Sequence, residues 1–345
     1  MPVPGPVNVL VASPLEPEQV ASIAAADDRL RLLYAPELLP VPRYQCDHTG
    51  VPRELSPADL NRWAQLREQA DVSFDFDWQS PADMPKLCPQ LRWVQATSAG
   101  IGAFLERTGL VHSDLVFTTA AGVHGTPLAE FALMGLLHFA KDMPTLTRWQ
   151  RQQHWERHTS GTLAGTTAVV VGLGGIGREV CRLLAAAGLT VHGCGRPGRS
   201  YHVPGVSGYT DTTRLREVLP AAGALILACP LTDQTRGLIG PAELAALPPG
   251  AVVVNVSRGQ VIDEPALISA LTSGHLAGAC LDVFAVEPLP QSSPLWAMDN
   301  VIVSPHSAAT AAAENALLTG LFIDNLRRWL AGEPLRNVYD RVAGY

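Results

Sequence analysis

Three ionisable side chains each stand at the end of an apolar, β-branched run: Arg258 after AVVVNVS, Glu287 after ACLDVFAV and His306 after VIVSP. Such runs are typical of buried parallel strands, whose carboxyl ends meet at one edge of a sheet, so we expect the three side chains to converge on one crevice. A histidine there can donate a proton near neutral pH, and a glutamate bonded to its ring would orient it and favour its charged form. An arginine offers a planar, charged fork to a carboxylate. The set suits proton transfer to a keto oxygen of a carboxylate-bearing substrate.

Each of the three also has an ordinary interpretation when it is taken singly. Arg258 would be a surface ion pair, Glu287 before Pro288 a solvated turn residue, and His306 after Pro305 a partner of the local backbone. The other nine of the ten histidines are interpreted as structural. His124 is the least ordinary of these, because it falls in a predicted hinge. Residue chemistry alone leaves both interpretations of the three side chains open.

A strand, a glycine turn, a helix and a second strand are predicted in succession within Thr166–Arg196. The strands are expected at 168–171 and 189–194 and the helix at 178–187, with Gly188 as its C-cap. Glycines between the first strand and the helix have the spacing G-x-G-x-x-G: Gly172, Gly174 and Gly177. They allow a tight turn, close approach of the backbone to a pyrophosphate, and close packing of helix on strand, while the helix N-terminus attracts the anion. A lone glycine turn would fit any α/β domain, but in this context it predicts a dinucleotide site.

The residue that ends the second strand of such a unit reads the adenosine ribose, where an acid accepts a hydrogen bond from the 2′-hydroxyl. Here that place is taken by Gly195, which lies 195 − 177 = 18 residues beyond the last fingerprint glycine. Arg196 and Arg199 follow, and the nearest downstream acid is Asp211. The pattern predicts NADP as the preferred cofactor and NAD as the alternative. The ordinary interpretation is two loop arginines in a site that accepts either.

Composition restricts the classes of protein to which the chain can belong. A chain of 345 residues with 47% apolar residues is long enough for two globular domains, and no apolar run reaches the ~18 residues of a membrane helix. The net charge of −7 argues against nucleic-acid binding, even beside the basic, tryptophan-bearing stretch at 148–158. The N-terminus lacks the basic region of a secretory signal. Six scattered cysteines without C-x-x-C indicate reduced thiols in a cytoplasm, and no metal-binding motif is present.

The remaining elements alternate along the chain in a pattern typical of two α/β domains. The expected strands are 7–13, 30–34, 71–77, 91–97, 115–119, 224–228, 251–256, 277–283 and 301–303. The expected helices are 14–26 with Ser13 as a possible cap, 57–69 capped by Ser56, 128–140, 241–247, 264–273 and 310–330 ending at Gly332. The helix at 128–140 is apolar nearly all round, so it belongs in a core or in a subunit interface.

The glycine fingerprint follows a whole α/β domain, whereas L-type lactate and malate dehydrogenases open with it. From about residue 90 to 340 the chain resembles the D-isomer-specific 2-hydroxyacid dehydrogenase family. Six ordered segments carry the resemblance: AGVHGTPLAEFAL (121–133), LAGTTAVVVGLGGIG (163–177), CPLTDQTRGLIG (229–240), NVSRGQVIDEPALISAL (255–271), LDVFAVEPLP (281–290) and VSPHSA (303–308). The resemblance implies an α/β fold of two doubly wound parallel-sheet domains. A Rossmann cofactor domain (123–311) would be inserted in a flavodoxin-like substrate domain (1–122 plus 312–345).

The resemblance also implies the site. It assigns the catalytic roles above to Arg258, Glu287 and His306, and the nicotinamide carboxamide to Asp282. The residues expected at the cofactor are Gly172, Gly174, Gly175, Ile176, Gly177, Arg196, Arg199, Cys229, Pro230, Thr235, Val256, Ser257, Asp282 and His306. The turn of Ser98, Ala99, Gly100 and Ile101 resembles the family's backbone nest for the substrate carboxylate, with a plain strand-to-helix turn as the alternative. Arg258 is expected at the substrate as well, and Trp296 either lines the substrate pocket or belongs to the core.

The function implied is reduction of a small 2-keto acid by NADPH to a D-2-hydroxy acid, of the glyoxylate/hydroxypyruvate type, by a homodimer that pairs through 128–140. NAD-dependent 3-phosphoglycerate or D-lactate dehydrogenases and phosphite dehydrogenases share the fold. Phosphoglycerate enzymes often carry an extra regulatory domain, and formate dehydrogenases use a partner other than Glu287 for the histidine. A nucleotide-sensing corepressor-like scaffold is the alternative of another class. The substrate side chain depends on loops such as 44–55 and 78–84.

Overall fold

The protein is described here by a computed structural model that covers residues 5–344. The chain divides into two compact units: an outer unit of Met1–His124 with Thr310–Tyr345, and an inserted unit of Gly125–Ala309. The sequence places the crossings at 122/123 and 311/312, and in the structure they lie at 124/125 and 309/310. Within the outer unit, His124 Nε2 lies 3.1 Å from Glu314 Oε1, so the points where the chain leaves and re-enters this unit are held together.

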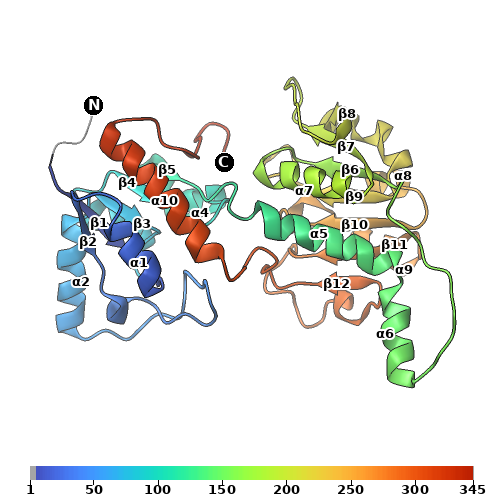
Figure 1. The fold of residues 1–345 in the computed structure, drawn as a ribbon, viewed down its shortest axis with the longest axis horizontal. Helices are drawn as coiled ribbons and strands as arrows, with labels where there is room; N and C mark the ends of the chain where they lie inside the picture. The colour runs from blue at the N-terminus through green and yellow to red at the C-terminus, as the bar shows by residue number, and fades with distance from the viewer. Residues whose placement is uncertain (1–4, 345) are drawn as a thin grey trace. The chain divides into compact units, whose positions relative to one another are not determined.

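The inserted unit is built on a sheet of seven strands in the order β12-β11-β10-β9-β6-β7-β8, all of them parallel (Figure 1). The strands are β6 (Thr167–Val171), β7 (Thr190–Gly195), β8 (Val206–Asp211), β9 (Ala224–Leu227), β10 (Ala251–Asn255), β11 (Leu276–Leu281) and β12 (Val301–Val303). Chain order reverses between β6 and β9, which are adjacent in the sheet. Ligands of doubly wound sheets bind at such a reversal, beyond the carboxyl ends of the strands.

Helices cover both faces of this sheet, which explains why its strands are apolar at consecutive positions. They are α5 (Gly125–Ala140), α6 (Met143–Gln152), α7 (Gly175–Ala186), α8 (Pro241–Ala246) and α9 (Glu264–Thr272), with 3₁₀ turns at Thr212–Glu217, Leu219–Ala221, Gly259–Val261 and Pro294–Ala297. Val170 packs in the core with α5 and α7, and its neighbour Val169 packs on the opposite face with α8 and α9. Figure 1 shows α5 and α7 lying together across one face.

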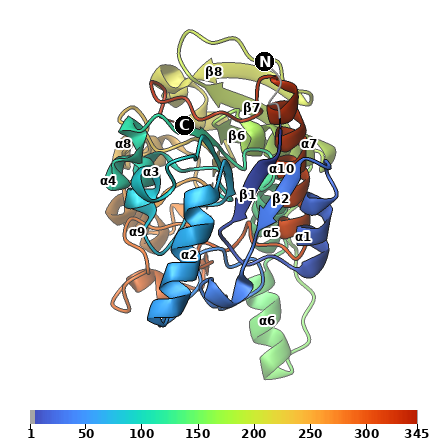
Figure 2. The ribbon, with the colours of Figure 1, turned by 90° about the vertical axis from the view of Figure 1, so that its left-hand side faces the viewer.

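The outer unit has five parallel strands in the order β2-β1-β3-β4-β5, the order of a flavodoxin-like sheet. The strands are β1 (Val7–Val11), β2 (Leu30–Leu33), β3 (Val72–Phe74), β4 (Trp93–Gln95) and β5 (Val116–Thr118). The helices are α1 (Pro17–Ala24), α2 (Pro57–Gln69), α3 (Met84–Leu87), α4 (Gly102–Thr108) and α10 (Glu314–Ala331), with 3₁₀ turns at Pro36–Leu38, Pro81–Asp83 and Leu110–His112. Helices α1 and α10 cover one face and α2 and α4 the other, as Figure 2 shows for α1, α10 and α2. The expected fold class is confirmed.

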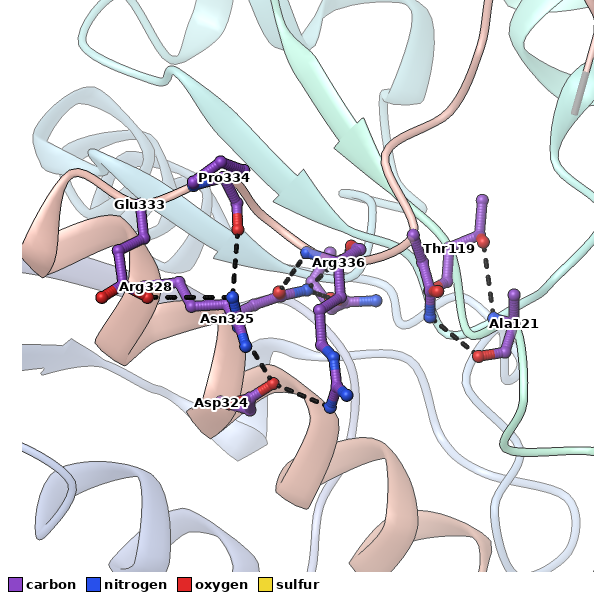
Figure 3. A network of polar contacts seen from close by, with 10 residues as sticks. Thr119, Ala121, Asp324, Asn325, Arg328, Glu333, Pro334 and Arg336 are labelled. Atoms are coloured by element: carbon purple, nitrogen blue, oxygen red, sulfur yellow. Dashed lines mark hydrogen bonds and ion pairs between the residues drawn. The ribbon is translucent and has the colours of Figure 1, made fainter.

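The segment after α10 is bound back onto the sheet of the outer unit. Asn325, fully buried on α10, accepts a hydrogen bond from Arg336 N at 2.8 Å and donates to Gln95 Oε1 on β4 at 3.0 Å. The Asn337 amide donates to the carbonyls of Thr119 and Ala121, just after β5. Figure 3 shows Arg336 beside Asn325 and Asp324, with Thr119 and Ala121 nearby. The tail therefore secures the carboxyl end of β5.

Some local predictions are confirmed and others are wrong. Ser56 caps α2 by accepting from Asp59 N at 3.2 Å, and Gly332 ends α10 with a positive φ of 72°. Ser13 does not cap α1, because that helix begins later, after Glu16, and Ser13 bonds to His48 instead. The strand at 206–211 is missed, since its glycine and polar residues lack an apolar pattern. Among the described residues, no helix combines the length and apolar character needed to span a membrane.

Candidate active site

The structure brings the histidine and the glutamate into direct contact. His306 Nδ1 donates to Glu287 Oε2 at 2.8 Å, and both side chains are partly exposed, at 44% and 36%. Since Nδ1 carries the hydrogen of this bond, Nε2 is the ring nitrogen left to exchange a proton with a substrate. No partner for Nε2 is found among residues 5–344. The pair has the geometry of an oriented proton donor.

Charge in this group is balanced across the three side chains. Partial burial by itself would raise the pKa of Glu287, but bonds from His306 and from Phe284 N–H, with the charges of His306 and Arg258, outweigh it and hold that pKa below its usual value. Burial lowers the pKa of Arg258, while the charges of Glu287 and Asp282 oppose this effect. Arginine remains charged at any working pH. The site therefore holds a fixed cation next to an ionised carboxylate.

Asp282 builds the turn that presents His306. Its Oδ1 accepts from Ser304 Oγ at 2.6 Å and from the backbone N–H groups of Ser307 and Ala308, each at 2.9 Å. The backbone N–H of His306 donates to the Asp282 carbonyl at 2.9 Å. His306 has a positive φ of 55°, which a side-chain residue adopts only when its surroundings hold it there. Asp282 thus holds the turn that orients the histidine. This role is additional to the one expected for Asp282 at the nicotinamide.

Residues outside the predicted set position the loops of Arg258 and Glu287. Asn255, buried at the end of β10, accepts from Ser257 Oγ at 2.7 Å and from Ser257 N at 3.0 Å, and its amide donates to the Arg258 carbonyl at 3.2 Å. Ala285 is held on both sides, because its N–H donates to Glu264 Oε2 and its carbonyl accepts from the Gln260 amide, each at 2.9 Å. A polar residue that ends an otherwise apolar strand, as in AVVVN, is the signal that could have identified Asn255.

The glycine fingerprint forms a cradle at the switch point between β6 and β9. Gly172 has a positive φ of 98°, and a Cβ on it would lie 2.6 Å from Cys229 Cα. A Cβ on Gly177 would overlap the Gly172 carbonyl, so helix and turn meet without space for a side chain. Nothing lies within 4 Å of the place where a Cβ of Gly174 would stand, just before α7 begins at Gly175. A closed turn with an open face at a helix N-terminus fits a pyrophosphate.

The other residues expected at the cofactor frame this cradle. Cys229, Val256 and Ser257 are buried just beyond the carboxyl ends of β9 and β10. Thr235 donates to the Pro230 carbonyl at 2.7 Å and closes the loop after β9. Burial raises the pKa of Cys229 to about 12, so this thiol stays protonated. Within the described part of the chain, no three His, Cys, Asp or Glu side chains gather as metal ligands.

Beyond β7, the two arginines occupy the ends of one tight turn. Arg199 N donates to the Arg196 carbonyl at 3.4 Å, across Pro197 and Gly198, and Gly198 has a positive φ of 71°. Proline followed by a glycine of positive φ is the signature of a type II turn. Both arginines are exposed, while Gly195 before them is buried. The turn thus places the backbones of two arginines close together just after β7.

The predicted carboxylate turn and Trp296 lie in different units of the chain. Ser98–Ile101 belongs to the outer unit, between β4 and α4, where Ala120 N donates to the Ser98 carbonyl at 3.1 Å. Ser98 and Gly100 are exposed and Ile101 is buried. Trp296 is 54% exposed and donates to the Pro290 carbonyl at 3.0 Å, so its interpretation as a core residue is wrong.

Sequence reasoning missed a buried polar cluster at the switch point of the outer sheet, between β1 and β3. Ser13 Oγ and His48 Nδ1 lie 3.1 Å apart, and Trp78 Nε1 donates to Asp75 Oδ2 at 2.7 Å. Asp75 has a positive φ of 69° and is fully buried, and this burial raises its pKa. The alternation of DVSFDFD, an acid within a strand pattern, was the available signal.

The geometry agrees with comparisons to known proteins. The family model "D-isomer specific 2-hydroxyacid dehydrogenase, NAD binding domain" matches residues 133–308. The chain belongs to this family. As a D-isomer specific 2-hydroxyacid dehydrogenase it is an NAD(P)-dependent oxidoreductase, and its inserted unit contains the NAD-binding domain.

Relatives of this dehydrogenase cover almost the whole chain. Glyoxylate/hydroxypyruvate reductase A of Salmonella heidelberg (strain SL476) is 31% identical over 306 residues, which is 86% of this chain and 95% of the relative. The crystal structure of a family member from Xanthobacter autotrophicus Py2 in complex with NADPH and MES is 34% identical, with a TM-score of 0.78 over 99% of this chain and 100% of that one. An NADPH-dependent glyoxylate/hydroxypyruvate reductase from Sinorhizobium meliloti, in complex with NADP and sulfate, is 28% identical, with a TM-score of 0.76 over 98% and 100%.

Proposed function

We propose that the protein reduces small 2-keto acids of the glyoxylate/hydroxypyruvate type to D-2-hydroxy acids and prefers NADPH. The observation that carries this proposal is the hydrogen bond of 2.8 Å between His306 and Glu287. The Glu287 carboxylate also interacts electrostatically with the charged Arg258. A proton donor and a fixed cation are what a 2-keto acid requires from the protein during reduction. The inserted unit serves as the cofactor domain and the outer unit as the substrate domain.

A bound nicotinamide supplies the hydride to the keto carbon. Arg258 holds the substrate carboxylate and keto oxygen by charged hydrogen bonds. His306 Nε2 donates its proton to the keto oxygen as the C–O double bond becomes a single bond, so hydride and proton together give the hydroxy acid. Glu287 keeps the ring in place through Nδ1–H and stabilises its charged form. In the reverse direction His306 accepts the proton from the hydroxyl.

The preference for NADPH rests on the end of β7. An acid that would repel a 2′-phosphate is absent there, because Gly195 takes its place, and Arg196 and Arg199 stand at the two ends of the following turn. Guanidinium groups bind phosphate with charge and with paired N–H donors. The similar proteins from Xanthobacter and Sinorhizobium are bound to NADPH and NADP.

One steady-state experiment tests both parts. Glyoxylate, hydroxypyruvate, pyruvate, phenylpyruvate and 2-ketoisocaproate are each reduced with NADPH and with NADH. We expect the highest kcat/KM with glyoxylate or hydroxypyruvate, and a KM for NADPH far below that for NADH. Equal or better use of NADH contradicts the cofactor preference. Nucleotide binding without turnover of any 2-keto acid would instead support a corepressor-like scaffold.

We also expect a homodimer that pairs through the region of residues 128–140. Helix α5 buries Leu128, Ala132 and Leu136 in its own unit but leaves Met134 and Leu137 exposed, at 42% and 40%. Exposed apolar side chains next to one another on a helix are typical of an association surface.

A further inference from the structure

Tyr201 occupies the space beside Gly195 at the end of β7. A Cβ built on Gly195 would lie 2.6 Å from Tyr201 Cζ and 2.7 Å from Cδ2, and closer still to Cε2. Real Cβ atoms do not approach other atoms this closely, so no side chain fits at position 195 while the ring stays in place. The ring therefore fills the place from which an acid would read the 2′-hydroxyl of the adenosine ribose in an NAD enzyme.

The same side chain contacts both arginines of the turn. The Tyr201 hydroxyl accepts a hydrogen bond from Arg196 N at 3.0 Å, and the guanidinium carbon of Arg199 lies 6.0 Å from the centre of the ring. The first contact fixes the start of the turn, and the second is at the limit of a cation–π interaction that favours Arg199 on this side. Tyr201 is itself held in a short loop, because Val203 N donates to Tyr209 Oη at 2.7 Å and Arg178 donates to the His202 carbonyl at 3.1 Å.

We infer that Tyr201 determines cofactor specificity. Its ring occupies the space that an acidic side chain at position 195 would need, and its contacts order Arg196 and Arg199 for the 2′-phosphate. The inference rests on the proposed NADP preference. An acid at position 195 requires that the ring move away, and the movement gives up the contacts with both arginines. Steric exclusion and phosphate binding are therefore coupled through one side chain.

The direct test uses ligands that carry only the relevant part of the cofactor. Affinities of the protein for 2′,5′-ADP and 5′-AMP are measured by calorimetry with the Tyr201→Ala, Tyr201→Phe and Arg196→Ala/Arg199→Ala variants. We expect Tyr201→Ala to weaken 2′,5′-ADP about tenfold, on the scale of a lost hydrogen bond and cation–π contact, and to leave 5′-AMP unchanged. Tyr201→Phe, which keeps the ring, loses about threefold. Equal weakening of both ligands would mean that the ring binds adenine, which overturns the inference.

A second arm tests the steric part with NADH affinity, followed by fluorescence. Gly195→Asp alone should bind NADH no better than the unchanged protein, whereas Gly195→Asp/Tyr201→Ala should bind it about tenfold more tightly, because the acid then reaches the ribose. If the single variant gains as much as the double one, Tyr201 does not guard the position.

The two arms also separate this inference from the proposal beneath it. If Arg196→Ala/Arg199→Ala keeps the full affinity for 2′,5′-ADP, the two arginines do not bind the 2′-phosphate, and the structural basis proposed for the NADP preference is wrong. If that variant loses affinity while Tyr201→Ala retains it, the preference stands and only the role of Tyr201 is wrong.

Discussion

His306 combines an uncommon backbone conformation with a fixed side chain. Its positive φ is held by Asp282, and its ring is held by Glu287. A residue in such a conformation is maintained only where several contacts determine it together, and these conformations cluster at functional sites. Contacts from Asp282 and Glu287 therefore fix the orientation of the His306 imidazole.

Replacing His306 by Gln removes the proton donor and keeps a side chain of similar length. General acid catalysis contributes about 10²- to 10⁴-fold, so kcat for the best 2-keto acid should fall by at least about a hundredfold. Affinity for NADPH, measured by fluorescence without substrate, should change far less than kcat and serves as the control. Retained turnover would refute the proton-donor role.

Asp75 gives a prediction about stability and pH. Burial raises its pKa above the ordinary value of 3.8, with the His48 charge and the Trp78 bond opposing, so the folded state binds the proton more tightly than the unfolded state. Stability then falls as pH rises from near 3.8 through the folded-state pKa. Asp75→Asn removes this cost, and its amide oxygen can still accept from Trp78.

The Tm of Asp75→Asn should therefore exceed that of the unchanged protein at pH 8, and the difference should shrink as pH falls toward 4. Thermal unfolding followed by circular dichroism at several pH values measures it. A lower Tm at pH 8 would mean that the carboxylate is needed in its charged form. Asp71→Asn, a partly exposed acid of the same segment, is a suitable comparison.

The tail after α10 acts as a further strand-like edge of the outer unit rather than as a loose end. Val338 bridges Thr118 of β5 in antiparallel fashion, and Tyr339 N donates to the Phe117 carbonyl at 2.8 Å. The Asn325 side chain links this tail to β4 from inside the core. Since Ala120, just beyond β5, also bonds to Ser98, the tail supports the predicted carboxylate turn indirectly.

Asn325→Ala should destabilise the protein by about 2 kcal/mol or more, because it removes the hydrogen bonds that this fully buried side chain makes with Gln95 and with the backbone of Arg336. Arg328→Ala, one helical turn later, removes partly exposed ion pairs with Asp324 and Glu333 and should cost less than about 1 kcal/mol. Figure 3 shows Asn325 and Arg328 with their polar contacts. Urea unfolding of the two variants compares their losses of stability. Equal losses would show that the tail is not secured through Asn325.

At the level of the assembled protein, the prediction is a dimer of twice the chain mass of 36.7 kDa, measured by light scattering after gel filtration. Leu137→Glu places a charge on the exposed apolar face of α5 and should yield monomers, because an unpaired buried charge opposes association. Leu60→Glu changes an exposed leucine on α2, at 50% against 40% for Leu137, and should leave the dimer intact. A dimer that survives Leu137→Glu would place the interface elsewhere.

Sequence patterns were sufficient for features that depend on neighbours along the chain. The period of apolar residues located most strands, and the fingerprint spacing and the Ser56 cap were legible because strand, turn and cap chemistry act over a few residues. Ends of elements were less accurate: α10 begins at Glu314 rather than at 310, and helix in the stretch 148–158 ends with α6 at Gln152. Where the local sequence gives no strong capping signal, tertiary packing decides at which residue a helix ends.

By itself, the sequence determined the family, the two parallel-sheet domains and the identity of the residues at the strand ends, since these follow from local order and spacing. Only the tertiary structure decided how those residues are held: Asp282 under the histidine turn, Asn255 under Arg258, Tyr201 over Gly195 and His48 against Ser13. Most of these contacts join different loops, some of them far apart in the chain. Their formation depends on packing in three dimensions, which no spacing along the sequence records.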